Sequence, residues 1–118
     1  MAWSAISGIQ DISWQEVTTD TNMAVMNGYV ANDTSAITFT LPTTSAIGDV
    51  IQIDGKGSGG WDIEQGAGQT IHWGSTSSTT GASGTVASTI QYQNAVLRCI
   101  TANTDWTIET ANGSLNIT

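Results

Sequence analysis

Apolar and polar residues alternate along most of this 118-residue chain, with the period of two that is typical of half-buried β-strands. The clearest run is AITFTL, in which Ile37, Phe39 and Leu41 share one face. Pro42 follows at once, and it marks a strand end because proline cannot donate to a sheet ladder. Residues 49–54 repeat the alternation. The pattern therefore predicts two successive strands with a turn between them.

Two further runs, residues 61–64 and 70–73, alternate in the same way on either side of Gly66-Ala67-Gly68. A short glycine-containing break between two strands predicts an antiparallel hairpin. The expected cross-strand pairs are Trp61 with Trp73, Asp62 with His72, and Ile63 with Ile71. In this register both tryptophans face the core, and the carboxylate of Asp62 stabilises the protonated imidazole of His72.

Strand signals continue to the end of the chain at intervals of about eight to twelve residues, with little helical pattern. We therefore predict an all-β fold, a small antiparallel sandwich or barrel of about eight to ten short strands. Residues 94–101 are apolar on both faces, which predicts a strand that is buried on both sides. Arg98 lies inside this strand. It is expected to pair with a carboxylate or to lie at a subunit interface.

One β domain is predicted over residues 13–118, because a chain of this length is typical of a single domain. Residues 1–12 precede it as an N-terminal arm, either one helical turn or a docking segment. The arm carries apolar residues at threefold spacing, namely Trp3, Ile6, Ile9 and Ile12. The polar segment 74–84 is predicted to be a loop and is the first candidate for a mobile or partner-facing segment.

Charged residues make up only 10% of the chain, against about 25% in an ordinary soluble domain. The net charge is −8, and Lys56 and Arg98 are the only basic residues. Nucleic acids and anionic membranes both require clustered basic side chains, so neither is an expected partner. The hydrophobic fraction of 39% predicts a folded chain. The lone Cys99 cannot form a disulfide within the chain and is expected to be buried.

The N-terminal sequence has neither the basic region nor the long apolar stretch of a secretory signal. No window approaches the roughly 18 consecutive apolar residues of a membrane-spanning helix. The composition is nevertheless typical of extracellular proteins. Release by cell lysis, as for a virion component, fits both observations, and so would export by a signal-independent system or a signal that has been removed.

The glycine-rich stretch Gly55-x-Gly57-x-x-Gly60 matches a dinucleotide fingerprint in its letters alone. That fingerprint needs a helix after it to receive the pyrophosphate, whereas a strand-like acidic run follows here. Residues 54–65 also resemble a calcium loop, but Lys56 and Gln65 stand where acidic ligands belong. A looser calcium site could still use Asp54, Asp62 or Glu64. No cofactor and no dedicated metal site are predicted.

His72 is the only imidazole and therefore the only histidine base that an enzyme of this sequence could use. Serines 75, 77 and 78 follow it, but the sequence supplies no recognisable oxyanion hole. Asp62 and Glu64 share a strand face, as any residues two apart in a strand do. We therefore predict that the protein is not an enzyme.

Tryptophan is abundant, and its flat ring suits stacking on sugars. Carbohydrate binding is thus the alternative function, with Trp61, Trp73, Asp62 and His72 as candidate ligand-binding residues. Tryptophans at alternating strand positions are more typical of a core, which is the interpretation favoured for Trp61, Trp73 and Trp106.

Several short motifs resemble those of β modules in bacteriophage tail fibres and other virion proteins. They are Tyr29-Val30-Ala31-Asn32, Phe39-Thr40-Leu41-Pro42, Ala46-Ile47-Gly48-Asp49, Gly59-Gly60-Trp61-Asp62-Ile63 and Gln69-Thr70-Ile71-His72-Trp73-Gly74. The resemblance implies a trimeric β assembly with a role in host attachment or virion architecture. Either a tail-fibre module or a capsid decoration protein fits, on an extracellular particle. Other copies of the chain and other virion proteins are the expected partners, and a cell-surface glycan is the partner in the alternative.

Overall fold

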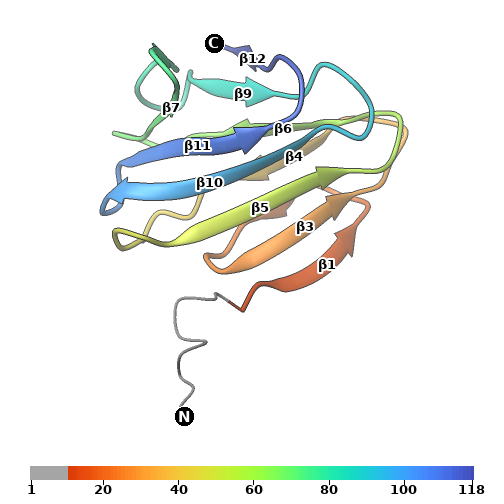
Figure 1. Cartoon of the computed structure of the whole chain (residues 1–118), viewed down its shortest axis with the longest axis horizontal. Helices are drawn as coiled ribbons and strands as arrows, with labels where there is room; N and C mark the ends of the chain where they lie inside the picture. The colour runs from red at the N-terminus through yellow and green to blue at the C-terminus, as the bar shows by residue number, and fades with distance from the viewer. Residues whose placement is uncertain (1–10) are drawn as a thin grey trace.

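The computed structural model describes residues 11–118, so the predicted arm lies almost entirely outside the described residues. The described part is all β, which confirms the predicted fold class (Figure 1). It measures 45 × 29 × 24 Å. Twelve short strands form two sheets. Within residues 11–118 there is no helix that is long and apolar enough to cross a membrane.

Seven strands form the larger sheet in the order β1-β3-β5-β10-β11-β7-β8. Their bounds are β1 Ser13–Val17, β3 Asn27–Ala31, β5 Val50–Gly55, β10 Asn94–Thr101, β11 Asp105–Ala111, β7 Thr70–Trp73 and β8 Thr76–Ser77. The smaller sheet has the order β12-β9-β6-β4-β2. Its strands are β12 Asn116–Ile117, β9 Thr85–Ala87, β6 Trp61–Glu64, β4 Ile37–Thr40 and β2 Thr21–Asn22.

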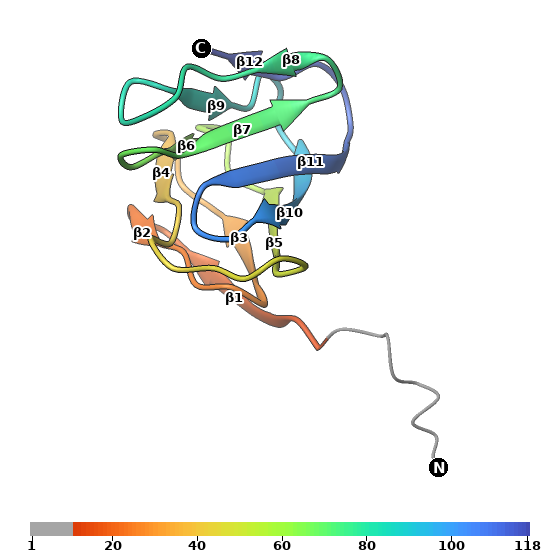
Figure 2. The ribbon, with the colours of Figure 1, turned by 90° about the vertical axis from the view of Figure 1, so that its left-hand side faces the viewer.

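The sheets are mixed rather than antiparallel, which corrects the predicted architecture. From β1 to β7 the chain changes sheet at every step. Among β1 to β6, strands that are neighbours within a sheet are therefore separated along the chain by a strand in the other sheet, and they run in the same direction. This arrangement produces the parallel pairs β1–β3 and β3–β5 in one sheet and β2–β4 and β4–β6 in the other. Figure 2 shows β4 and β6 on one side of the core and β5 and β10 on the other.

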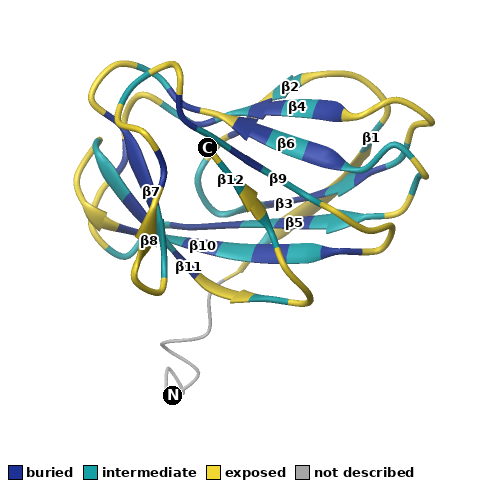
Figure 3. Ribbon diagram, turned by 90° about the horizontal axis from the view of Figure 1, so that it is seen from above, coloured by how far each residue is buried: buried dark blue, intermediate teal, exposed yellow. Residues whose placement is uncertain are grey.

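The core lies between the two sheets, where inward side chains from both meet. Figure 3 shows buried residues on strands of both sheets. Phe39 and Ile63 of the smaller sheet are fully buried, as are Ile53 and Leu97 of the larger one. The rings of Tyr29 and Phe39 meet across the sheets with centroids 5.4 Å apart. Burying an aliphatic or aromatic side chain of this size contributes about 1.5–3 kcal/mol, so this layer is the main source of stability.

Strand β10 alternates between buried and half-exposed residues, so the prediction that it is buried on both faces is wrong. Its inward residues, Leu97 and Cys99 among them, are inaccessible to solvent, whereas Ile100 is exposed. The burial of Cys99 confirms the expectation for the lone thiol. Arg98 faces outward, and its Nε lies 2.6 Å from Oε2 of Glu109. This ion pair is the first of the two alternatives expected for Arg98.

Candidate functional site

The predicted pair of Asp62 and His72 does not exist, because the hairpin that would bring them together does not form. Strand β6 belongs to the smaller sheet and β7 to the larger one, so residues 65–69 connect the two layers. Asp62 pairs with Thr38 on β4 and with Ala87 on β9 instead. The glycines between the strands were correctly recognised as a turn, but the turn leads across the core instead of back along the same sheet.

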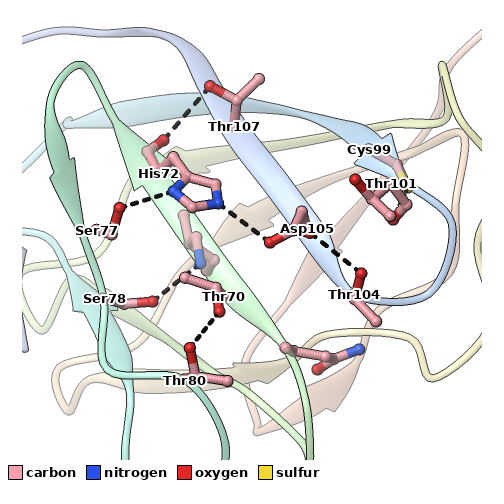
Figure 4. A network of polar contacts seen from close by, with 12 residues as sticks. Thr70, His72, Ser77, Ser78, Thr80, Cys99, Thr101, Thr104, Asp105 and Thr107 are labelled. Carbon is pink, nitrogen blue, oxygen red and sulfur yellow. Dashed lines mark hydrogen bonds and ion pairs between the residues drawn. The ribbon is translucent and has the colours of Figure 1, made fainter.

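His72 forms a different polar network on the larger sheet, shown in Figure 4. Its Nδ1 lies 2.7 Å from the hydroxyl oxygen of Ser77, which is the directly opposed residue of β8. Its Nε2 lies 3.1 Å from Oδ1 of Asp105 at the start of β11. The β7–β8 connection has two residues, and its first residue, Gly74, has a φ of 60°. Glycine at that position suits a tight hairpin turn, which brings Ser77 opposite His72.

Asp105 is the acidic end of this network, and its surroundings favour the carboxylate. The hydrogen bond with His72 lowers the pKa of Asp105, and the Thr104 hydroxyl, 3.2 Å from Oδ2, lowers it further. Partial desolvation opposes these effects. Serine, histidine and aspartate thus lie in the order that serine hydrolases use, with the ring nitrogens interchanged.

The location of the network favours a structural role over a catalytic one. The side chains of His72 and Asp105 are each about a third exposed, at 31% and 33%, on the outer face of the sheet. Hydrolysis depends on donors fixed around a substrate oxyanion in a site that excludes water. A hollow of about 520 Å³ among the described residues is lined by residues 22–25 and 40–44, and the network is not part of its lining. The network ties the edge strand β8 to β7 and β11.

The tryptophans that were candidates for sugar stacking are mostly in the core. Trp61 is 1% exposed, and its indole N–H donates to the carbonyl of Gln93 at 2.9 Å. Trp106 is fully buried, and Trp73 is partly buried against the core. Trp14 is different: it is 47% exposed and covers Gly28, where an added Cβ would lie 2.5 Å from the indole ring. The faces of Trp61 and Trp106 are therefore closed to a ligand.

The looser calcium site is not assembled. Asp54 lies on β5 of the larger sheet, whereas Asp62 and Glu64 lie on β6 of the smaller one. Burial raises the pKa of Asp54, which opposes the charged form that a cation needs. Among residues 11–118, no three histidine, cysteine or acidic side chains are grouped closely enough to hold a metal ion.

The predicted loop 74–84 is more ordered than its composition suggested. It contains β8, and its Ser78 is buried. The Gln65 amide donates to the carbonyl oxygens of Thr79 and Gly81 at 3.0 and 3.1 Å. This loop is therefore attached to the β6–β7 connection by a buried glutamine.

A second feature, which the sequence did not predict, is the β9–β10 loop over residues 88–93. Ile90 is 53% exposed and Tyr92 is 66% exposed, so two large apolar side chains project into solvent from one loop. Tyr92 also has a φ of 65°, in the left-handed region that bulky residues avoid. We call Ile90, Gln91 and Tyr92 the tip. The β-rich sequence of residues 85–91 predicts a strand as far as residue 91, whereas β9 ends at Ala87.

Gln93 holds the tip in place from inside the molecule. Its side chain is fully buried, and its Oε1 accepts from the backbone N–H of Thr89 at 2.6 Å. Its Nε2 donates to the carbonyl oxygens of Asn112 and Ser114 at 2.7 and 2.9 Å. Both ends of the amide are satisfied, which fixes the loop against the β11–β12 connection.

The tip itself makes few contacts with the rest of the protein. The Gln91 amide donates to the carbonyl of Lys56 at 3.0 Å, and Asn112 reaches the Tyr92 carbonyl at 3.4 Å. Gly113 lies under Ile90, where an added Cβ would come within 3.2 Å of its Cδ1. A rigid loop that displays an aromatic and an aliphatic side chain offers an apolar contact surface.

No family model matches this sequence, and no curated protein is detectably similar to it.

Proposed function

We propose that this chain is a non-enzymatic structural module of a virus particle, in which three copies associate through the tip. The observation that carries the proposal is the exposure of Ile90 and Tyr92 on a loop whose backbone is strained but held by a buried glutamine. The resemblance of its short motifs to those of bacteriophage tail fibres and virion proteins supports the particle and the trimer.

The strain at Tyr92 supports a role in recognition. A non-glycine residue held at positive φ costs on the order of 1–3 kcal/mol and persists only where the surroundings enforce it. Here the enforcement comes from Gln93, and the tyrosine ring gains little burial in return, since it is 66% exposed. A loop that is already ordered loses less entropy when it binds a partner.

The charge distribution supports a neutral, apolar contact. Both basic residues are engaged in ion pairs, Lys56 with Glu16 at 3.0 Å and Arg98 with Glu109 at 2.6 Å. The loop over residues 88–93 contains no charged residue. Three acidic chains therefore approach one another with the least repulsion where the surface is uncharged, as it is at the tip.

Carbohydrate binding is the second candidate, and the exposed ring of Tyr92 favours it. Of the described aromatic side chains, Trp14 and Tyr92 are the exposed ones, and only Tyr92 lies on a loop. Sugar stacking needs the ring but not the neighbouring aliphatic side chain. Ile90→Ala would thus leave glycan binding intact while it weakens association between copies, which separates the two functions.

Sedimentation equilibrium of the whole chain tests the proposal. The wild type is expected to have three times the 12.3 kDa chain mass, and Ile90→Ser combined with Tyr92→Ser is expected to sediment as a monomer. Ile47→Ser is the matched control, since Ile47 is 76% exposed on another loop, and it should remain trimeric. A monomeric wild type would overturn the trimer, and binding to a glycan array that Tyr92→Ala abolishes would then establish the alternative.

A further inference from the structure

An apolar groove opens beside the edge strand β2. It encloses about 520 Å³ and is lined by residues 22–25 and 40–44, none of which carries a charge. Met23 and Leu41, which are 3% and 2% exposed, belong to the hydrophobic core. Ala24 is exposed and Val25 is half-buried, so apolar surface continues from the core to solvent. The groove is therefore an uncharged, partly apolar surface on an acidic chain.

The groove and the tip lie at opposite ends of β5. At the start of this strand, the carbonyl of Val50 accepts at 2.7 Å from the backbone N–H of Met26, which directly follows the lining residue Val25. At its end, the N–H of Gly55 donates at 2.9 Å to the carbonyl of Gln93, which directly follows the tip. A strand of six residues spans about 17 Å. Because Gln93 also fixes the tip in place, the tip does not reach the groove of its own chain.

The tip and the groove match in their chemistry. The tip offers the aliphatic side chain of Ile90 and the ring of Tyr92, which are 53% and 66% exposed. The groove offers apolar surface inside and the exposed polar residues Asn22, Thr43 and Thr44 at its rim. A bound tyrosine buries its ring and needs a hydrogen-bond partner for its hydroxyl, which an amide or hydroxyl side chain can supply. The groove thus has both kinds of group that the tip requires.

The charge of the chain also favours a contact between these two surfaces. Every copy has a net charge of −8, so two copies repel each other wherever acidic surface meets acidic surface. The groove and the loop over residues 88–93 carry no charged residue. Joining them removes apolar surface from water on both sides and desolvates no charged side chain.

We propose that the tip of one copy binds in the groove of the next copy. The side chains of Ile90 and Tyr92 then cover Met23 and Leu41 of the neighbouring chain. Because the tip and the groove are different surfaces, the contact runs head to tail, and three such contacts close a ring. This inference rests on the proposed trimer and names the surface that receives its tip.

Sedimentation of Ala24→Arg in the full chain tests the groove. Ala24 is exposed, so the fold can accommodate an arginine that places a charge in the groove. We expect this variant to be a monomer at the concentration at which the wild type is a trimer. Gln15→Arg adds the same charge at an exposed residue of β1 outside the groove, and it should remain trimeric. A trimeric Ala24→Arg variant would overturn the inference, whereas a monomeric wild type would overturn the proposed trimer and the inference with it.

Cross-linking between introduced cysteines identifies the surface that the tip meets. Gln91→Cys and Ala24→Cys are combined in one full chain and treated with a short bismaleimide, while the buried thiol of Cys99 is inaccessible to the reagent. The inference predicts covalent dimers and trimers on a denaturing gel, and none from either single variant. Covalent dimers from Gln91→Cys alone would show that tips meet tips, which would overturn the inference and leave the proposed trimer intact. A double variant without linked chains, beside a trimeric wild type, would also overturn it.

Discussion

The first and second halves of the chain build the same kind of strand but connect it differently. From β1 to β6 each strand is followed by one in the opposite sheet, and the strands of this half that pair with one another are parallel. From β7 onward the chain also makes local hairpins, β7–β8 and β10–β11. The alternation of apolar residues is the same in both halves. The period therefore determines which face of a strand is buried, while the connection determines which strand becomes its neighbour.

The connections explain the difference in physical terms. Sheets that pack face to face lie about 10 Å apart, so a few residues suffice to cross between them. The crossing from β6 to β7 is supported by Gln65 and Gln69, both buried, whose side chains satisfy backbone groups in the loops. The β7–β8 hairpin depends instead on its own two-residue turn. The first half thus depends on long-range contacts, and the hairpins of the second half depend more on local geometry.

The largest effect is expected from the glutamine that supports the crossing. Gln65→Ala removes an amide that donates to Gln69, Thr79 and Gly81, and it leaves those carbonyl oxygens without this donor. Because each unsatisfied buried polar group costs about 1–3 kcal/mol, we expect a loss of about 3 kcal/mol in the free energy of unfolding. Urea denaturation measures it, with Gln15→Ala on the exposed strand β1 as the control. Equal stability of the two variants would contradict the importance of the crossing.

A smaller effect is expected where β1 packs against β3 in the first half of the chain. Gly28→Ala would place a methyl group 2.5 Å from the Trp14 ring, which must then move away. We expect a cost of about 1 kcal/mol, at the low end for overpacking because Trp14 is half-exposed and can swing outward. In a Trp14→Ala background the same change should be neutral or stabilising, since glycine weakens strands. Thermal unfolding of the four proteins measures this coupling, and strictly additive effects would contradict it.

An effect of similar size is expected from the two fully buried tryptophans, one in each half of the chain. The Trp61 indole N–H is bonded to the Gln93 carbonyl, whereas that of Trp106 has no hydrogen-bond partner among residues 11–118. Replacement by phenylalanine creates a similar void in each case. Trp61→Phe also removes a hydrogen bond, so it should cost about 1 kcal/mol more than Trp106→Phe. Parallel urea titrations measure the difference, and a larger loss for Trp106→Phe would refute it.

The smallest effect concerns the pH dependence of the His72 network. The pKa of Asp105 is lowered in the folded protein, chiefly by its hydrogen bond with His72. A carboxyl group whose pKa is lowered by folding stabilises the folded protein fully at pH values above its unfolded-state pKa of about 3.9. This contribution is lost as the pH falls through the folded-state pKa. Asp105→Asn should therefore reduce stability at pH 6 by less than about 1 kcal/mol and have little effect at pH 2. A loss of stability in Asp105→Asn that grows toward low pH would contradict this prediction.

Much of the strand pattern could be predicted from the sequence, because it depends on local alternation. The runs at 36–41, 49–54 and 61–64 correspond to β4, β5 and β6 within one or two residues at each end. The directions of these strands could not be predicted, since they depend on which sheet each connection reaches. The sequence predicts one strand over residues 94–101, which is β10, but a run of apolar residues does not distinguish outward half-exposed positions from buried ones.

The candidate site likewise combines residues that the sequence points to with contacts that depend on the assembled fold. The sequence proposes His72 as a candidate site residue, but its acidic partner is 33 residues away in sequence and is brought close only by the parallel pairing of β7 with β11. The sequence does not reveal the tip, because isoleucine and tyrosine, as at Ile90 and Tyr92, are common in strands. Their exposure depends on Gln93, whose burial and hydrogen bonds follow from the assembled fold.

The crossing between the sheets at residues 65–69 is the central feature of this account, because it gives His72 its partners and sets the order of the strands around it. Nuclear Overhauser effects from the His72 ring protons test it directly. We predict cross-peaks to the β protons of Asp105 and Ser77 and none to those of Asp62. Cross-peaks from His72 to Asp62 would contradict the account, because they would place β6 and β7 side by side in one hairpin.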